Sequence, residues 1–158
     1  MEHSLKTGLS FGSSSGIITT LGLMVGLYSG TGSKMVVIGG ILIIAIADAF
    51  SDAAGIHMSE ESENKHTAGQ IWSATFFTFL FKFFFSAIFI FPVLWFTLPI
   101  ALVISIIWGL SLLSVFSFYL ARQQKEKTWK VIGEHLLIAV VVIILTHYVG
   151  SWVNIRFS

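Results

Sequence analysis

The chain has 158 residues, of which 55% are apolar and only 11% are charged, and its net charge is +1. A folded domain in water normally carries about 25% charged residues, because its surface must be wetted. The composition therefore argues against a water-soluble enzyme, and the small net charge provides no electrostatic basis for nucleic-acid binding. The chain contains no cysteine, which excludes disulfides and thiolate metal sites within it.

Five apolar segments are separated by short polar connectors, and each segment is long enough to cross a bilayer. Their unbroken apolar character favours helices over barrel strands, which alternate over about 10 residues. We predict an all-α integral membrane bundle, a single five-span transmembrane domain over residues 1–158. The predicted spans lie at about 9–28, 35–58, 71–94, 99–121 and 131–153.

Lysine and arginine are distributed unequally between the two ends of this bundle. One end carries Lys6, Lys65, Arg122, Lys125, Lys127 and Lys130, whereas the other carries Lys34 and Arg156. Short cytoplasmic loops hold the excess of positive residues. We therefore expect a cytoplasmic N-terminus and an external C-terminus. The compact chain suits a multi-pass protein of a prokaryotic plasma membrane.

Three ionisable residues stand out inside the predicted spans, where each costs roughly 2.5–3.5 kcal/mol to insert. Asp48 and Asp52 are four residues apart in the second span, so they share one helix face with Ser51 close by. Hard divalent cations prefer such oxygen ligands. A proton can replace a cation on the same carboxylate, so the pair predicts a metal- and proton-binding site.

Lys82, in the third span, is the third such residue. At ~1.5 Å per residue, Lys82 lies roughly 16 Å from the cytoplasmic end and Asp48 about 15 Å, so the two can pair. The pair is either a structural ion pair or a modulator of the ion site. In the first case Asp52, about 9 Å deep, remains as the unpaired functional carboxylate.

The first span is rich in small and polar residues. Ser15 lies about 9 Å deep, level with Asp52, and Thr19 follows one turn later, so both offer neutral oxygens to an ion. The span also has small-xxx-small spacings that let helix backbones approach closely in lipid, at Gly12, Gly16, Gly22 and Gly26. This polar helix either lines a cation path together with the second span or simply packs tightly in the bundle.

Acidic residues near the cytoplasmic end form a candidate ion entrance. Glu60, Glu61 and Glu63 either concentrate cations at the mouth or are a solvated helix end. Glu134, one turn inside the fifth span, either belongs to the same entrance or extends to the interface. The histidines show no metalloprotease or nucleophile spacing, so no enzymatic activity is expected.

The segments 15–27 (SGIITTLGLMVGL), 47–56 (ADAFSDAAGI) and 59–63 (SEESE) together resemble the vacuolar iron transporter family. The resemblance implies a five-helix homodimer whose ion path runs between protomers and is lined by the first two spans. We then expect the dimer to form through the first span, at Gly12, Gly16, Gly22 and Gly26. Members exchange cytosolic Fe²⁺ or Mn²⁺ for protons and move the metal out of the cytosol, so the metal is a substrate and no cofactor is implied.

The chain departs from the family pattern in three places. Ser15 stands where the family has an aspartate, and Asp52 stands where it has a methionine, whereas Asp48 keeps the family's acidic position. The cytoplasmic metal-binding insert of longer members is missing. Either the carboxylate has been relocated from position 15 to position 52, which lie at the same estimated depth, or the substrate has changed. The alternative function is therefore a relative that moves another small cation, or a membrane assembly or regulatory protein.

Overall fold

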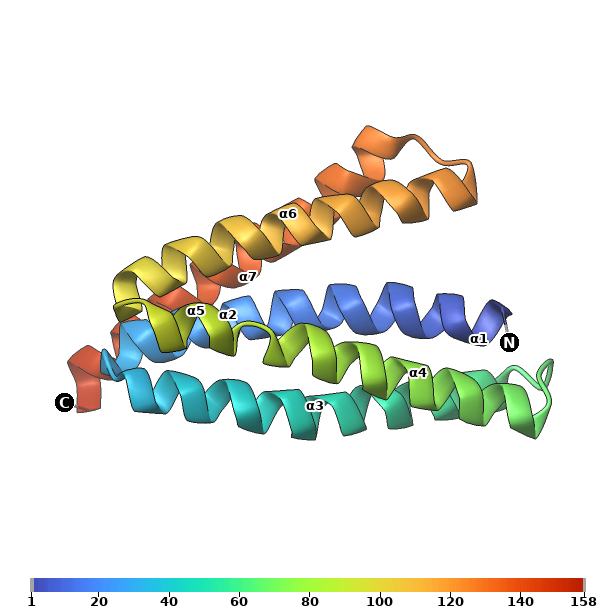
Figure 1. The fold of residues 1–158 in the computed structure, drawn as a ribbon, viewed down its shortest axis with the longest axis horizontal. Helices are drawn as coiled ribbons and strands as arrows, with labels where there is room; N and C mark the ends of the chain where they lie inside the picture. The colour runs from blue at the N-terminus through green and yellow to red at the C-terminus, as the bar shows by residue number, and fades with distance from the viewer. Residues whose placement is uncertain (1, 158) are drawn as a thin grey trace.

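The computed structural model describes residues 2–157, which form helices joined by short connectors, without a strand (Figure 1). The helices are α1 (Glu2–Thr7), the π-helical turn η1 (Gly8–Gly12), α2 (Ser13–Thr31), α3 (Lys34–Ser62), α4 (Ala68–Ala87), α5 (Ile90–Trp95), α6 (Leu98–Gln124) and α7 (Thr128–Phe157). The elements α1, η1 and α2 follow one another without a break and form one continuous helix.

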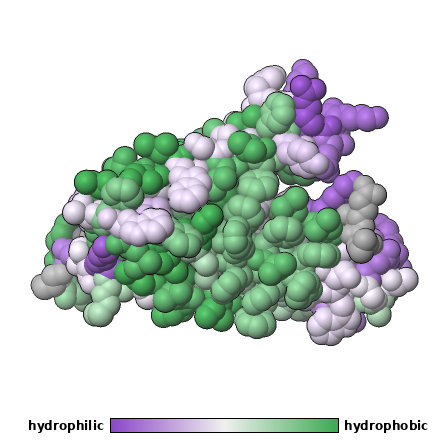
Figure 2. Space-filling model, in the orientation of Figure 1, coloured by the Kyte–Doolittle hydropathy of each residue, from purple (hydrophilic) through white to green (hydrophobic). Residues whose placement is uncertain are grey.

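Within residues 2–157, five helices are long and apolar enough to cross a membrane. They are Ser4–Thr31, Lys34–Ser62, Ala68–Trp95, Leu98–Gln124 and Thr128–Phe157, and each contains one of the predicted spans. Apolar residues cover the middle of the visible face, and hydrophilic residues gather towards its ends (Figure 2). The prediction of an all-α, multi-pass membrane protein is therefore confirmed at this level.

Successive spans run in opposite directions. The tight turn after α2 uses Gly32 in the left-handed region, at φ 61°, and Ser33 then caps α3 by accepting from the Val36 N–H. This turn and the C-terminal end of α7 lie at one end of the bundle, whereas α1 and the connectors after α3 and α6 lie at the other (Figure 1). Which end faces the cytoplasm stays a prediction.

The third span is not the continuous helix expected over 71–94. It breaks at residues 88–89, between α4 and α5. The cause is Pro92, which lacks an N–H, and whose ring would clash with the carbonyl of Ile88 in a regular helix. The Ile88 carbonyl instead accepts from the Phe91 N–H at 3.3 Å.

Buried residues recur at every fourth position along several helices. In α6 the stripe runs through Ala101, Ser105, Gly109, Leu113, Ser117 and Ala121, and in α3 through Val37, Ile41, Ala45, Ala49 and Ala53. Small side chains along such stripes let helix backbones approach closely, which is how helices associate where water does not drive them together.

The glycines of the first span contact neighbouring helices of the same chain. A Cβ on Gly12 would lie 2.8 Å from the Thr78 carbonyl oxygen in α4, and one on Gly22 would lie 2.6 Å from Val142 in α7. Gly16 likewise faces α4, and Gly26 faces α7. These four glycines therefore pack against α4 and α7 within the chain, and their expected role as the dimer contact stays a prediction. The homodimer itself stays a prediction.

We expect Gly150→Ala to destabilise the protein by about 1–3 kcal/mol, the usual cost of overpacking. The added Cβ would collide with the Gly26 carbonyl, where α2 and α7 approach most closely. Gly133→Ala, in the same helix, is the matched control, because nothing lies within 4 Å of its added Cβ. Thermal unfolding in detergent should show a lower midpoint for Gly150→Ala alone, and equal midpoints would contradict this account.

Candidate functional site

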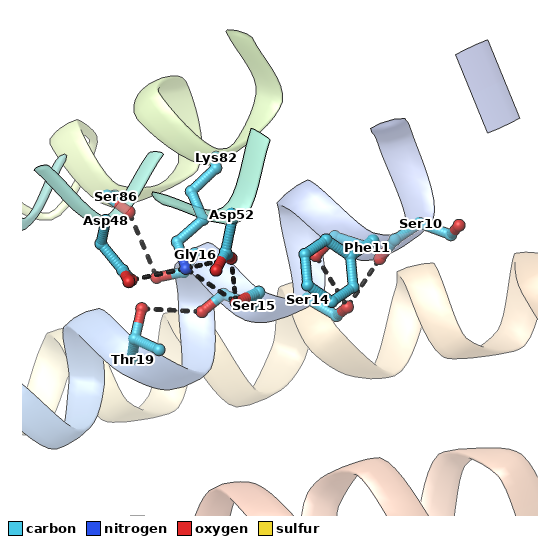
Figure 3. Close-up of polar contacts among 10 residues, drawn as sticks. All are labelled: Ser10, Phe11, Ser14, Ser15, Gly16, Thr19, Asp48, Asp52, Lys82 and Ser86. Atoms are coloured by element: carbon cyan, nitrogen blue, oxygen red, sulfur yellow. Dashed lines mark hydrogen bonds and ion pairs between the residues drawn. The ribbon is translucent and has the colours of Figure 1, made fainter. Parts of the chain in front are cut away.

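Lys82 is the centre of a polar cluster inside the bundle. Its side chain is only 1% exposed. The ammonium forms an ion pair with Asp48 Oδ2 at 2.5 Å, and it donates hydrogen bonds to Asp52 Oδ2 and, at 2.8 Å, to Ser15 Oγ (Figure 3). An ammonium has three N–H donors, and three oxygen atoms from two other helices surround this one.

Two features of the sequence bring this cluster together: the four-residue spacing of the aspartates and the glycines of the first span. Asp48 and Asp52 lie one turn apart on α3, so both reach the same point on α4. In the first span, a Cβ at Gly16 would lie 3.0 Å from the backbone carbonyl oxygen of Lys82. A Cβ at Gly12 would lie 3.1 Å from the backbone nitrogen of Lys82. Two glycines one turn apart therefore allow the α2 backbone to lie directly against Lys82.

Ser15 links the ammonium to one of the carboxylates. Its hydroxyl accepts from Lys82 Nζ and donates to Asp52 Oδ2, each at 2.8 Å. The cluster thus contains one cationic and two anionic groups, with a formal charge of −1 when all three are ionised. Charges attract strongly in a low-dielectric interior, so this contact holds α2, α3 and α4 together at one level.

The two carboxylates are more accessible than the lysine. The Asp48 side chain is 29% exposed and that of Asp52 is 20% exposed. Asp48 and Ser51 line one end of an open groove of about 700 Å³ between α2 and α3, and apolar residues such as Leu27 form the rest of its wall. A small cation in this groove would therefore meet a carboxylate before it met the ammonium.

Most of the predicted site residues lie together. Asp48, Asp52, Ser15 and Lys82 form the cluster, and Ser51 lies beside Asp48 in the groove. Thr19 lies one turn away, where its hydroxyl donates to the Ser15 carbonyl at 2.8 Å (Figure 3). The expectation that pairing with Asp48 would leave Asp52 unpaired is wrong, because the buried ammonium reaches both carboxylates.

The predicted entrance acids are not gathered into one group. Glu60 is nearly buried and lies 3.3 Å from His66, and Glu63 lies 3.6 Å from Lys65. Glu61 is exposed in the same segment. Glu134 lies in the second turn of a different helix, α7, where it pairs with Lys130 at 3.9 Å. The two segments lie at the same end of the bundle but on opposite sides of α1 (Figure 1).

Among residues 2–157, no three histidine or acidic side chains come close enough to hold a metal ion by themselves. A divalent ion at Asp48 and Asp52 would therefore need further oxygens, from hydroxyl groups such as Ser15 and Ser51, from water, or from a second subunit. Such an all-oxygen set suits hard cations, which take six or more oxygen ligands.

One participating residue was not expected from the sequence. Ser86, buried one turn beyond Lys82, donates to the Gly16 carbonyl at 3.5 Å and so ties α4 to α2 beside the cluster. The signal was available, since Thr78, Lys82 and Ser86 recur every four residues in a helix rich in phenylalanine. A polar stripe of this kind marks the helix face that meets other helices.

No protein-family model matches the chain, and no curated protein or solved structure matches it either.

We expect Lys82→Met to lose about 3–5 kcal/mol of stability, the cost of leaving a buried charge without its partner. Lys130→Met, at an exposed position in α7, is the control and should be near neutral. The triple variant Lys82→Met/Asp48→Asn/Asp52→Asn removes all three charges and should recover most of the loss. If the triple variant unfolds as early as the single one, the loss comes from packing rather than from charge.

Proposed function

We propose that this protein is a membrane transporter that exchanges a divalent transition-metal cation, Fe²⁺ or Mn²⁺, for protons. The supporting observation is the pair of intramembrane carboxylates, Asp48 and Asp52, held around one ammonium while Asp48 stays open to a groove. Ionisable groups at such a depth are expensive, and they typically mark ion pathways and proton relays.

Lys82 occupies the place that a bound cation would take. A divalent ion that binds both carboxylates neutralises them, so the ammonium then has to move away or lose its proton. The metal and protons therefore compete for the same groups, which is the basis of exchange. Ser15 and Ser51 supply neutral oxygens. The Thr19 hydroxyl donates a hydrogen bond to the backbone carbonyl of Ser15.

The resemblance of the first two spans to vacuolar iron transporters supports the direction and the assembly. By that resemblance, the protein moves metal out of the cytosol as a homodimer, and its compact chain suits a prokaryotic plasma membrane. The groove face of α3, which carries Asp48 and Ser51, is then where a second protomer would add its carboxylates. Glu60, Glu61, Glu63 and Glu134 lie at the end from which the metal would enter.

In proteoliposomes loaded with a metal-sensitive dye, we expect external Mn²⁺ or Fe²⁺ to enter while the lumen becomes alkaline. Asp52→Asn and Asp48→Asn should each reduce this flux by at least tenfold, because each removes a ligand that also carries the proton. Glu126→Gln, in the exposed connector after α6, is the control for a lost acid. Wild-type flux in Asp52→Asn would rule out this site.

A second function is favoured by the burial of Lys82. The Lys82 side chain is 1% exposed and its ammonium is surrounded by three oxygens, which is also typical of a permanent structural ion pair. The protein would then be a relative that moves another small cation, or a membrane assembly or regulatory protein. Absence of Mn²⁺ and Fe²⁺ flux, together with a strong loss of stability in Lys82→Met, would favour this second function.

A further inference from the structure

An open groove of about 550 Å³ lies between α3 and α4, near the connector that joins them. Two pairs of rings that join the helices lie at its two ends. The ring centroids of Phe50 and Phe79 are 4.5 Å apart, and those of His57 and Trp72 are 4.7 Å apart. Seven residues separate the two pairs on each helix, which corresponds to about 10 Å.

The groove exists because the α3 residues between the two ring pairs are small. Ala53 and Ala54 lie between Phe50 and His57 on the helix face that lines the groove, and Phe76 lines it from α4. Residues spaced by three, four and seven positions share one face of a helix. The two alanines therefore form a flat floor with a ring at each end. Such a slot suits a flat aromatic ligand, because aromatic rings attract one another in edge-on and offset arrangements.

His57 brings a hydrogen-bond acceptor to this groove. The Thr75 hydroxyl donates to the Ile71 carbonyl at 2.8 Å, so its 2.9 Å contact with His57 has Nδ1–H as the donor. In the neutral ring the other nitrogen, Nε2, is then an acceptor. Within residues 2–157 this nitrogen makes no hydrogen bond. A ligand that carries a donor would therefore complete the hydrogen bonding of the imidazole.

The position of the groove along the helices indicates a ligand with one polar end. His57 and Trp72 lie near the ends of the predicted second and third spans, and tryptophan is typical of the membrane interface. Phe50 and Phe79 lie about 10 Å deeper. Apart from His57 and Thr75, the residues that line the groove are apolar. These positions match a ligand with a hydroxyl at the interface and a hydrocarbon tail that extends towards the middle of the bilayer.

We propose that this groove binds a lipid-soluble phenol, that is, an aromatic ring that carries a hydroxyl and a hydrocarbon tail. The ring lies over Ala53 and Ala54, and its hydroxyl donates to Nε2 of His57. The tail passes Phe50 towards the middle of the bilayer. An acyl chain of a phospholipid offers neither the ring nor the donor. This inference does not depend on the proposed transport activity, because it uses none of the residues of the Lys82 cluster.

The test is a displacement assay with tritiated 4-nonylphenol in phosphatidylcholine nanodiscs, where acyl chains compete for the groove throughout. Unlabelled 4-nonylphenol should displace the probe at about fivefold lower concentration than its methyl ether, which has the same ring and tail but no donor. This difference is the net effect of one hydrogen bond. Decanol, which has a hydroxyl but no ring, should also displace the probe less well. Absence of saturable binding, or equal displacement by the phenol and either of the other compounds, would overturn the proposal.

Two variants locate the binding site. His57→Phe keeps a ring but removes the acceptor, so the phenol and its methyl ether should bind it equally well. His135→Phe is the matched control, because His135 also contacts a hydroxyl through Nδ1, that of Ser117 at 2.7 Å, but lies outside the groove. Ala54→Leu, at an exposed position on the groove floor, should weaken binding of both compounds. A fivefold preference that persists in His57→Phe, or wild-type affinities in Ala54→Leu, would overturn the proposal.

Discussion

A single ammonium in a hydrocarbon environment constrains the arrangement of the first three spans. Lys82 cannot stay charged inside the bundle without anionic partners. Among the described residues, Asp48 and Asp52 are the acids that form ion pairs with it. Meeting this requirement brings α3 against α4, and it brings α2 into the same contact through Ser15. The glycines of the first span have no side chain to prevent this approach.

The same cluster would connect stability with the proposed exchange. Because the ion pairs join α2, α3 and α4, a cation that separates Lys82 from its carboxylates would loosen the packing of all three helices at once. If the proposed ion binding occurs, the site would respond to it by rearrangement, and coupled movement of helices is what alternating access requires. A cluster that is essential for folding and a cluster that binds a transported ion are therefore compatible descriptions.

The rest of the bundle is attached differently. Small-residue contacts hold α7 and α6 to α2, most tightly where Gly26 meets Gly150 and where Gly109 meets Leu21. These contacts lie towards the end opposite to the N-terminus, and at the N-terminal end α6 and α7 diverge from the first span (Figure 1). Close packing at glycines thus occurs on both sides of α2, and the α2–α4 side also has the buried charges of the Lys82 cluster.

The sequence alone determined the class of protein and the five helices, because long apolar runs dictate both. It also placed Asp48 near Lys82 and Ser15 level with Asp52. Only the tertiary structure decided that Lys82 reaches both acids and that the first-span glycines pack within the chain. The spans are apolar on nearly every side, so the pattern along the chain does not specify how each helix is rotated towards its neighbours. That rotation depends on which backbones can approach and which charges must meet.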